Sequence, residues 1–220
     1  MNLVKSFDYF DPTKVNGLCH IIGCGSVGST VAENLVRLGV DKFALYDFDT
    51  VDSHNLVNQM FVKADIGRPK VEATADNILA INDEAKVKLY PEGYTNQNLN
   101  GYVFLCVDSI DLRREICQNQ KMNRSIKLVI DFRTGLEEGQ MYAANWGDMK
   151  QVENLLRSMD FTHEEAKDAT PVTACGMALG VAPTVRAVCT AGVCNFVNFI
   201  KTGKLKTFAV INPFQWELIC

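Results

Sequence analysis

A glycine-rich turn between an apolar run and a helical pattern constrains the fold of this chain more than any other feature. The run at residues 18–22 is followed at once by a G-x-G-x-x-G motif at Gly23, Gly25 and Gly28. Apolar residues then recur at helical spacing until Gly39, which provides a stop. Strand, tight turn and helix in this order let a phosphate approach the backbone at Gly25, where helix N–H groups can bind the anion. The motif therefore predicts a nucleotide-binding turn.

Strands and helices alternate along the rest of the first half. The expected strands are 18–22, 43–46, 87–90, 102–107 and 128–132, and the expected helices are 27–38, 69–81 and 111–123. Such alternation predicts an α/β fold with a Rossmann-like, mostly parallel sheet and helices on both faces. A smaller C-terminal strand and helix extension is expected at 140–146, 149–159, 176–201 and 205–211, with the last helix bent or broken at Pro183. No linker or repeat divides residues 1–220, so we expect a single domain.

Composition excludes several classes of protein. The formal net charge of −4 over 220 residues gives no electrostatic basis for nucleic acid or an anionic membrane as the main partner. The longest apolar stretch is interrupted by Pro183, Arg186 and Asn195, which argues against a membrane span. The N-terminus lacks a signal-type apolar segment, so we expect a cytoplasmic protein with reduced thiols. The eight cysteines contain no C-x-x-C pair, which argues against a structural zinc site.

Carboxylates and amides follow the second expected strand. Asp47 lies about 20 residues after the glycine turn, where nucleotide-binding folds place the acceptor for a ribose hydroxyl. This acid would serve NAD or ATP equally well. Asp49, Asn55, Asn58 and Gln59 come soon afterwards, and an ordinary dinucleotide-binding domain does not require them.

Four motifs in a fixed order discriminate between the two nucleotides. They are Asp47-Phe48-Asp49-Thr50-Val51, Asn55-Leu56-x-x-Gln59, Gly67-Arg68-Pro69-Lys70 and Cys106-Val107-Asp108-Ser109. From about residue 18 to residue 200 the sequence resembles the ThiF/MoeB/ubiquitin-activating family, whose members adenylate the C-terminus of a ubiquitin-like protein. The resemblance implies ATP in place of NAD, Mg²⁺ with it, and a single ThiF-type nucleotide-binding domain.

The resemblance also implies roles for individual residues. Asp47 matches the ribose-binding acid, Asn55 and Gln59 match amides near the phosphates, Lys70 matches the phosphate-contacting lysine, and Asp108 matches the acid that holds Mg²⁺. A lysine at this place supplies charge where the α-phosphorus accumulates negative charge, and Mg²⁺ prefers a carboxylate together with phosphate oxygens. The complete set expected to bind nucleotide is Gly23, Gly25, Ser26, Gly28, Asp47, Asp49, Asn55, Gln59 and Lys70.

One departure leaves the activity open. Position 58 is asparagine where the family has an arginine, and an amide replaces neither the charge nor the fork of a guanidinium. Either another cation substitutes, with Arg68, Arg113 and Arg133 as candidates, or the chain is a nucleotide-binding interaction module that does not adenylate. We favour a working but divergent enzyme. An NAD-dependent oxidoreductase is a third alternative, supported only by the glycine turn and Asp47.

Cys175 precedes a G-V-A-P segment, as does the family cysteine that accepts the activated acyl group. The resemblance therefore implies that Cys175 is a candidate nucleophile, and a semi-buried structural cysteine is the alternative. The acidic segment 161–170 is expected to cross over the site, with Thr162 and Glu165 forming a capping box. The implied partner is a ubiquitin-like or sulfur-carrier protein with a Gly-Gly tail. We expect a homodimer with the apolar helix at 176–200 at its interface, while a monomer with that helix in its core is equally permitted by the sequence.

Overall fold

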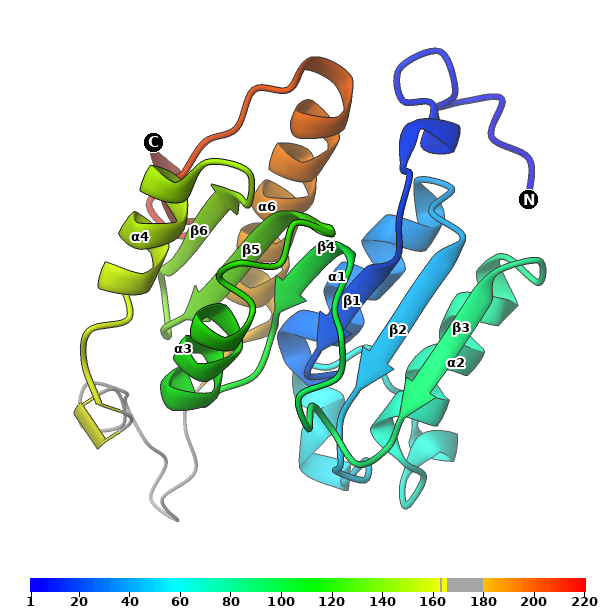
Figure 1. Cartoon of the computed structure of the whole chain (residues 1–220). Helices are drawn as coiled ribbons and strands as arrows, with labels where there is room; N and C mark the ends of the chain where they lie inside the picture. Colours follow the sequence, from blue (N-terminus) through cyan, green and yellow to red (C-terminus); the bar gives the residue numbers. More distant parts are fainter. Residues whose placement is uncertain (163, 166–179) are drawn as a thin grey trace.

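A single eight-stranded sheet organises the computed structural model, which describes residues 1–162, 164–165 and 180–220 (Figure 1). The strand order is β3-β2-β1-β4-β5-β6-β7-β8. The first five strands are parallel and the last three are antiparallel to their neighbours. The strands are β1 (Cys19–Ile22), β2 (Lys42–Tyr46), β3 (Lys86–Tyr90), β4 (Gly101–Leu105), β5 (Ile126–Thr134), β6 (Gly139–Asn145), β7 (Phe208–Asn212) and β8 (Glu217–Ile219). The predicted fold class is confirmed, although β8 was not predicted.

Helices cover both faces of this sheet. In Figure 1, α3 and α4 lie in front of it, and α1, α2 and α6 lie behind it. The helices are α1 (Ser26–Arg37), α2 (Lys70–Ile81), α3 (Ile110–Asn119), α4 (Met149–Arg157) and α6 (Ala182–Thr202), with short 3₁₀ helices at Pro12–Lys14, Ser53–Val57 and Lys63–Asp65. Each face has its own apolar cluster, one with Leu35 and Val188 against Phe104 and the other with Ile116 and Val152 against Val129. Central strands buried on both faces explain the near-continuous apolar runs of the sequence.

The long apolar helix is part of the core of this chain. Within α6, Val188, Cys189 and Phe196 are fully buried, and the helix packs along α1, β5, β6 and β7. It begins at Ala182 with Pro183 in its first turn, where a missing N–H costs nothing. The helix was expected to be bent or broken at Pro183, and the structure has no helix at residues 180 and 181 and no bend at Pro183, since α6 begins there. The helix start expected at 176 lies outside the described residues.

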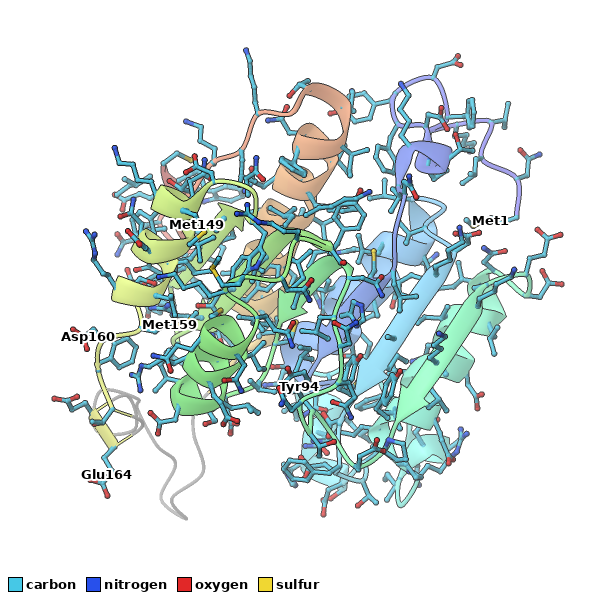
Figure 2. All side chains as sticks on the ribbon, in the orientation of Figure 1. Met1, Tyr94, Met149, Met159, Asp160 and Glu164 are labelled. Atoms are coloured by element: carbon cyan, nitrogen blue, oxygen red, sulfur yellow. The ribbon has the colours of Figure 1, made fainter. Side chains whose placement is uncertain are left out.

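The chain crosses the sheet between β3 and β4 without a helix. Residues 91–100 carry it from one side of β1 to the other, and Tyr94, labelled in Figure 2, packs at an angle on Tyr46 with ring centroids 6.2 Å apart. The connection after β1 therefore leads to β2 on one side, and the connection after β4 leads to β5 on the other side. In open α/β sheets, ligands bind in the crevice at the carboxyl ends of the strands at such a switch point.

The segment after α4 leads towards the same edge of the sheet. Figure 2 shows Met159, Asp160 and Glu164 along it, below α4. Two arginines fix its start, since Arg114 donates from Nε to the Met159 carbonyl at 3.0 Å and Arg133 donates from Nη1 to the Ser158 carbonyl at 2.7 Å.

The predicted capping box at the start of the acidic segment is confirmed. Thr162 N–H donates to Glu165 Oε2 at 2.7 Å, and Glu165 N–H donates to Thr162 Oγ1 at 3.1 Å. Across the described ranges no helix has the length and apolar character needed to cross a membrane.

Candidate nucleotide site

The glycine turn lies at the carboxyl ends of β1 and β4. Gly23 has φ +93°, and a Cβ there would come within 2.9 Å of the Cys106 carbonyl group and the Val107 nitrogen. A Cβ on Gly28 would lie 1.8 Å from the Gly23 oxygen. These two glycines therefore allow β1, β4 and α1 to approach one another. Gly25 differs, because a Cβ there would meet no atom within 4 Å.

The first turn of α1 offers unpaired N–H groups beside Gly25. Ser26 is the first residue of the helix, Gly25 is its N-cap, and no side chain caps it. Ser29 Oγ instead donates to the Gly25 carbonyl at 2.7 Å. A helix start with free N–H groups next to open space is a favourable place for a phosphate. The open position at Gly25 and the uncapped start of α1 therefore suit the phosphates of a nucleotide.

Asp47 is held at the end of β2 against this turn. Its Oδ2 accepts from the Cys24 N–H at 2.6 Å and its Oδ1 accepts from the Asp49 N–H at 2.9 Å. Partial burial raises the pKa of the Asp47 carboxyl above its ordinary value, and these two hydrogen bonds oppose the rise. The carboxylate is fixed in orientation, and its remaining lone pairs can accept from a ribose hydroxyl.

Lys70 and Asp49 form an ion pair at the start of α2. Lys70 Nζ lies 2.8 Å from Asp49 Oδ2, and the Lys70 N–H donates to the Asp49 carbonyl at 2.9 Å. The lysine side chain is 9% exposed and the aspartate side chain 52% exposed. The structure therefore places two predicted residues in contact and holds the ammonium group in a defined position.

The segment at residues 55–60, here called the amide segment, packs on the first turn of α1. Asn55 is buried, and its Oδ1 accepts from the Asp52 N–H at 2.8 Å, so part of its side chain closes a local turn. Gln59 Oε1 is buried and has no hydrogen-bond partner among the described residues. The Met60 N–H donates to Ser29 Oγ at 3.1 Å, which anchors the segment to α1. The unpartnered Gln59 oxygen is suited to a donor from a ligand.

Asp108 lies on the opposite side of the turn, after β4. It is exposed, and Ser109 behind it caps α3 by accepting from the Leu112 N–H at 3.2 Å. The described residues contain no group of three or more His, Cys, Asp or Glu side chains that could hold a metal ion. A single protein carboxylate matches the way Mg²⁺ is bound with substrate phosphates, because the phosphates and water provide the other ligands.

The three arginines predicted to substitute at position 58 all have other partners. Arg113 is buried and donates from Nη1 to Asp131 Oδ1 at 2.6 Å and from Nε to the Val107 carbonyl at 2.8 Å. Arg133 donates from Nε to the same carboxylate at 2.8 Å. Arg68 pairs with Asp65 and Asp76. Asn58 itself donates from Nδ2 to the Gly180 carbonyl at 3.4 Å. Each of these three guanidinium groups already has a carboxylate partner, which argues against a role at the phosphates.

A fourth arginine, whose place near the site was not predicted from the sequence, lies close to the amide segment. Arg186 is exposed in the second turn of α6 and contacts Met60 Sδ from Nη1 at 2.9 Å. Its sequence signal was a single charge at the start of an apolar helix. That signal does not reveal that α6 begins beside residues 58–60.

The described cysteines divide into buried and exposed groups. Burial raises the pKa of each of five thiols well above its ordinary value, which keeps them protonated: Cys19, Cys24, Cys106, Cys117 and Cys189. Cys194 and Cys220 are exposed. Cys175, the predicted nucleophile, lies outside the described residues.

Comparisons with known proteins agree with this geometry. The ThiF family model matches residues 15–214. Ubiquitin-like modifier-activating enzyme 5 of Drosophila willistoni is 27% identical over 144 residues, 56% of this chain and 34% of that protein. The protein of the same name from Caenorhabditis elegans is 34% identical over 70 residues, 32% of this chain and 17% of that protein. The match thus spans about a third or less of these curated relatives.

Solved structures add evidence on the fold. The chain is similar to Escherichia coli MccB with ATP, with a TM-score of 0.72 at 17% identity over 94% of this chain and 64% of that one. It is also similar to PaaA, with a TM-score of 0.71 at 19% identity over the same shares. At these identities the similarity concerns the fold alone.

Proposed function

Because this chain belongs to the ThiF family, we propose that it is an ATP-dependent adenylyltransferase. Its substrate would be the C-terminal glycine of a ubiquitin-like or sulfur-carrier protein with a Gly-Gly tail. The products would be an acyl-adenylate and pyrophosphate. The observation that carries this proposal is the open face of the turn at Gly25, with Asp47 after β2 and Asp108 after β4 on either side of it.

The proposed reaction requires positioning and charge neutralisation rather than a base. The carboxylate of the partner is already ionised at neutral pH. One of its oxygens would attack the α-phosphorus, and the bond from that phosphorus to the pyrophosphate oxygen would break with its electron pair leaving on pyrophosphate. Lys70 and the first N–H groups of α1 would stabilise the charge that develops on the phosphoryl oxygens. Asp108 would hold Mg²⁺, which supplies further positive charge when bound.

A second step would transfer the acyl group to Cys175. The thiolate would attack the acyl carbon, forming a thioester as AMP leaves. The five buried thiols are poor candidates, because burial keeps them protonated. A thioester that survives without reductant and disappears in Cys175→Ala would support this step. Adenylation itself does not depend on it.

One observation favours a different function. Asn58 is neutral, and the three nearby candidate arginines are paired with carboxylates. A chain with too little positive charge at the phosphates would bind nucleotide without transferring AMP efficiently, and would act as an interaction module. An NAD-dependent oxidoreductase is the weaker alternative, since the glycine turn and Asp47 are its only support.

The decisive experiment is ATP–pyrophosphate exchange with Mg²⁺ and a panel of small proteins with Gly-Gly tails. Wild type and Asp108→Ala are compared, and Asp111→Ala serves as the matched control because Asp111 is a nearby exposed carboxylate that pairs with Arg114. Exchange that is lost in Asp108→Ala and kept in Asp111→Ala supports the proposal. ATP binding without exchange for any carrier favours the interaction module, and tighter binding of NAD than ATP favours the oxidoreductase.

The proposed assembly is a homodimer, which light scattering of the purified chain tests directly. A molar mass near that of one chain at working concentrations would contradict it.

A further inference from the structure

We propose that Arg186 binds the terminal phosphates of the nucleotide, and so supplies the cation that the amide segment lacks. This inference rests on the proposed function, because it assigns a further residue to that site. Arg186 belongs to α6, an element far along the chain from the glycine turn and from the segment that contains Asn58.

The beginning of α6 lies against the first turn of α1. Cys189, one turn after Arg186, donates from Sγ to the Val27 carbonyl in the first turn of α1 at 3.6 Å. Gly180, just before α6, accepts from Asn58 Nδ2 at 3.4 Å. The two helices therefore start at the same edge of the sheet, and the residues that lead into α6 contact the amide segment. Arg186 lies between these two contacts along the chain.

Arg186 contacts the amide segment itself. Its Nη1 lies 2.9 Å from Met60 Sδ, and the Met60 backbone is in turn bonded to Ser29 in the first turn of α1. A thioether sulfur is a weak acceptor. Among the described residues no carboxylate forms an ion pair with Arg186. Arg186 is an exposed residue, and its weak contact with Met60 Sδ involves one of the nitrogens of a group with five N–H donors.

The charge at the site requires a further cation. Lys70 is already paired with Asp49, and the three arginines considered above are paired with Asp65, Asp76 and Asp131. The phosphates of ATP bring several negative charges to this edge. A guanidinium matches phosphate oxygens with two parallel hydrogen bonds, and exchange of a sulfur for a phosphate oxygen strengthens its bonding. To bind a phosphate at this edge, Arg186 would exchange its contact with Met60 for the anion.

The test measures the affinity of ATP, AMP and inorganic tripolyphosphate for the whole chain with Mg²⁺, by titration calorimetry. Wild type, Arg186→Ala and Arg186→Lys are compared. Arg37→Ala is the matched control, because Arg37 is an exposed arginine at the opposite end of α1 that pairs with Glu33 at 2.8 Å. Thermal melting of each variant confirms that it folds. Loss of an exposed arginine without a carboxylate partner should leave the melting temperature nearly unchanged.

We expect Arg186→Ala to weaken ATP and tripolyphosphate about 10- to 100-fold and to leave AMP within about twofold, because the lost contacts are charge-assisted and lie at the terminal phosphates. Arg186→Lys should recover part of the loss and Arg37→Ala should show none. Equal ATP affinity in wild type and Arg186→Ala, or an equal loss for ATP and AMP, would overturn the inference.

The three ligands also separate this inference from the proposed function. If wild type binds tripolyphosphate but not ATP, the proposed function fails, and weaker tripolyphosphate binding in Arg186→Ala still supports the inference. If wild type binds and exchanges ATP but Arg186→Ala does so equally, only the inference fails. If wild type binds neither ligand, both are overturned.

Discussion

The ammonium group of Lys70 is held 2.8 Å from the Asp49 carboxylate before any nucleotide arrives. Asp49 is half exposed while Lys70 is nearly buried, so the pair keeps the lysine in a fixed place at moderate desolvation cost. A phosphate that approaches Lys70 would have to share the ammonium group with Asp49. This relationship makes the two residues separable by experiment.

Lys70→Ala should lower the rate of ATP–pyrophosphate exchange by roughly two to three powers of ten, because one cation at the developing phosphoryl charge is lost. Lys63→Ala is the control, since Lys63 is an exposed lysine in the nearby 3₁₀ helix. Exchange in Lys70→Ala equal to that of wild type would remove Lys70 from the proposed mechanism.

Asp49→Asn should reduce stability, because it leaves a nearly buried ammonium group with a weaker partner. We expect a loss of about 1–2 kcal/mol in the free energy of unfolding, limited by the exposure of the carboxylate. Urea unfolding measures it. Asp76→Asn, which breaks an exposed pair with Arg68, should cost less than about 1 kcal/mol. Equal losses in the two variants would show that the burial of Lys70 has no energetic consequence.

Asp131→Asn should lower the free energy of unfolding more than Asp49→Asn or Asp76→Asn does. Asp131 is fully buried in β5 and accepts from Arg113 and Arg133, so its loss leaves two guanidinium groups with reduced compensation. Breaking a buried ion pair costs about 3–5 kcal/mol. The change would also loosen the Val107 carbonyl, which Arg113 holds next to Asp108. A drop in melting temperature is expected, and a variant as stable as wild type would contradict the structural role of this cluster.

His20 gives the chain a defined pH dependence of stability. It is buried, with Nδ1 at 2.9 Å from the Tyr46 hydroxyl and Nε2 accepting from the Asn100 N–H at 3.3 Å. Burial lowers the pKa of His20 from 6.5 to about 4. Between these values the unfolded chain binds more protons, so the stabilisation is complete above about pH 6.5 and is lost as pH falls towards 4.

The full effect of this titration is about 3 kcal/mol. Urea unfolding of wild type and His20→Gln from pH 7 to pH 4.5 isolates it, because the other titrating groups are common to both proteins. The stability advantage of wild type should shrink as the solution is acidified. Parallel curves for the two proteins would show that His20 does not carry the dependence.

The parallel half of the fold was predictable because its signals are local. The run at residues 18–22, the three glycines and Asp47 each follow from near neighbours in the sequence, and the structure places them at one edge of the sheet. Of the bend or break predicted at Pro183, the bend does not occur, because a proline is disruptive inside a helix but is accommodated in the first turn, where α6 begins. Strand β8 is too short and exposed for its pattern to predict it.

The pairing of charges was not predictable. Arg113 and Arg133 are close to the motifs in the sequence, yet both pair with one carboxylate of β5. Position along the chain does not say which guanidinium finds a buried partner. For the same reason Arg186 was not considered as a cation for the site, since its proximity to Met60 arises only when α6 packs on α1.

Gly25→Ala should mainly weaken ATP binding, whereas Gly28→Ala should mainly lower stability. Gly25 has open space at its Cβ position and φ −74°, but its ψ of −148° lies beyond the ordinary β region, so alanine should cost about 1–2 kcal/mol. Its methyl group should weaken ATP binding at least about tenfold. Gly28→Ala would force a methyl group onto the Gly23 oxygen and should cost about 3 kcal/mol or more. Melting temperature and ATP affinity measured together check both outcomes.

This contrast has a consequence for how such sequences diverge. Gly23 and Gly28 are required for the packing of the chain, because a side chain at either position would clash with the backbone. Selection for folding alone is therefore sufficient to preserve them. At Gly25 a side chain would meet no other part of the chain, so that face of the turn is left open to a ligand. A lineage that stopped binding a ligand there would be free to drift at position 25 while keeping Gly23 and Gly28, so the proposed site requires that binding, and not folding, keeps the middle glycine.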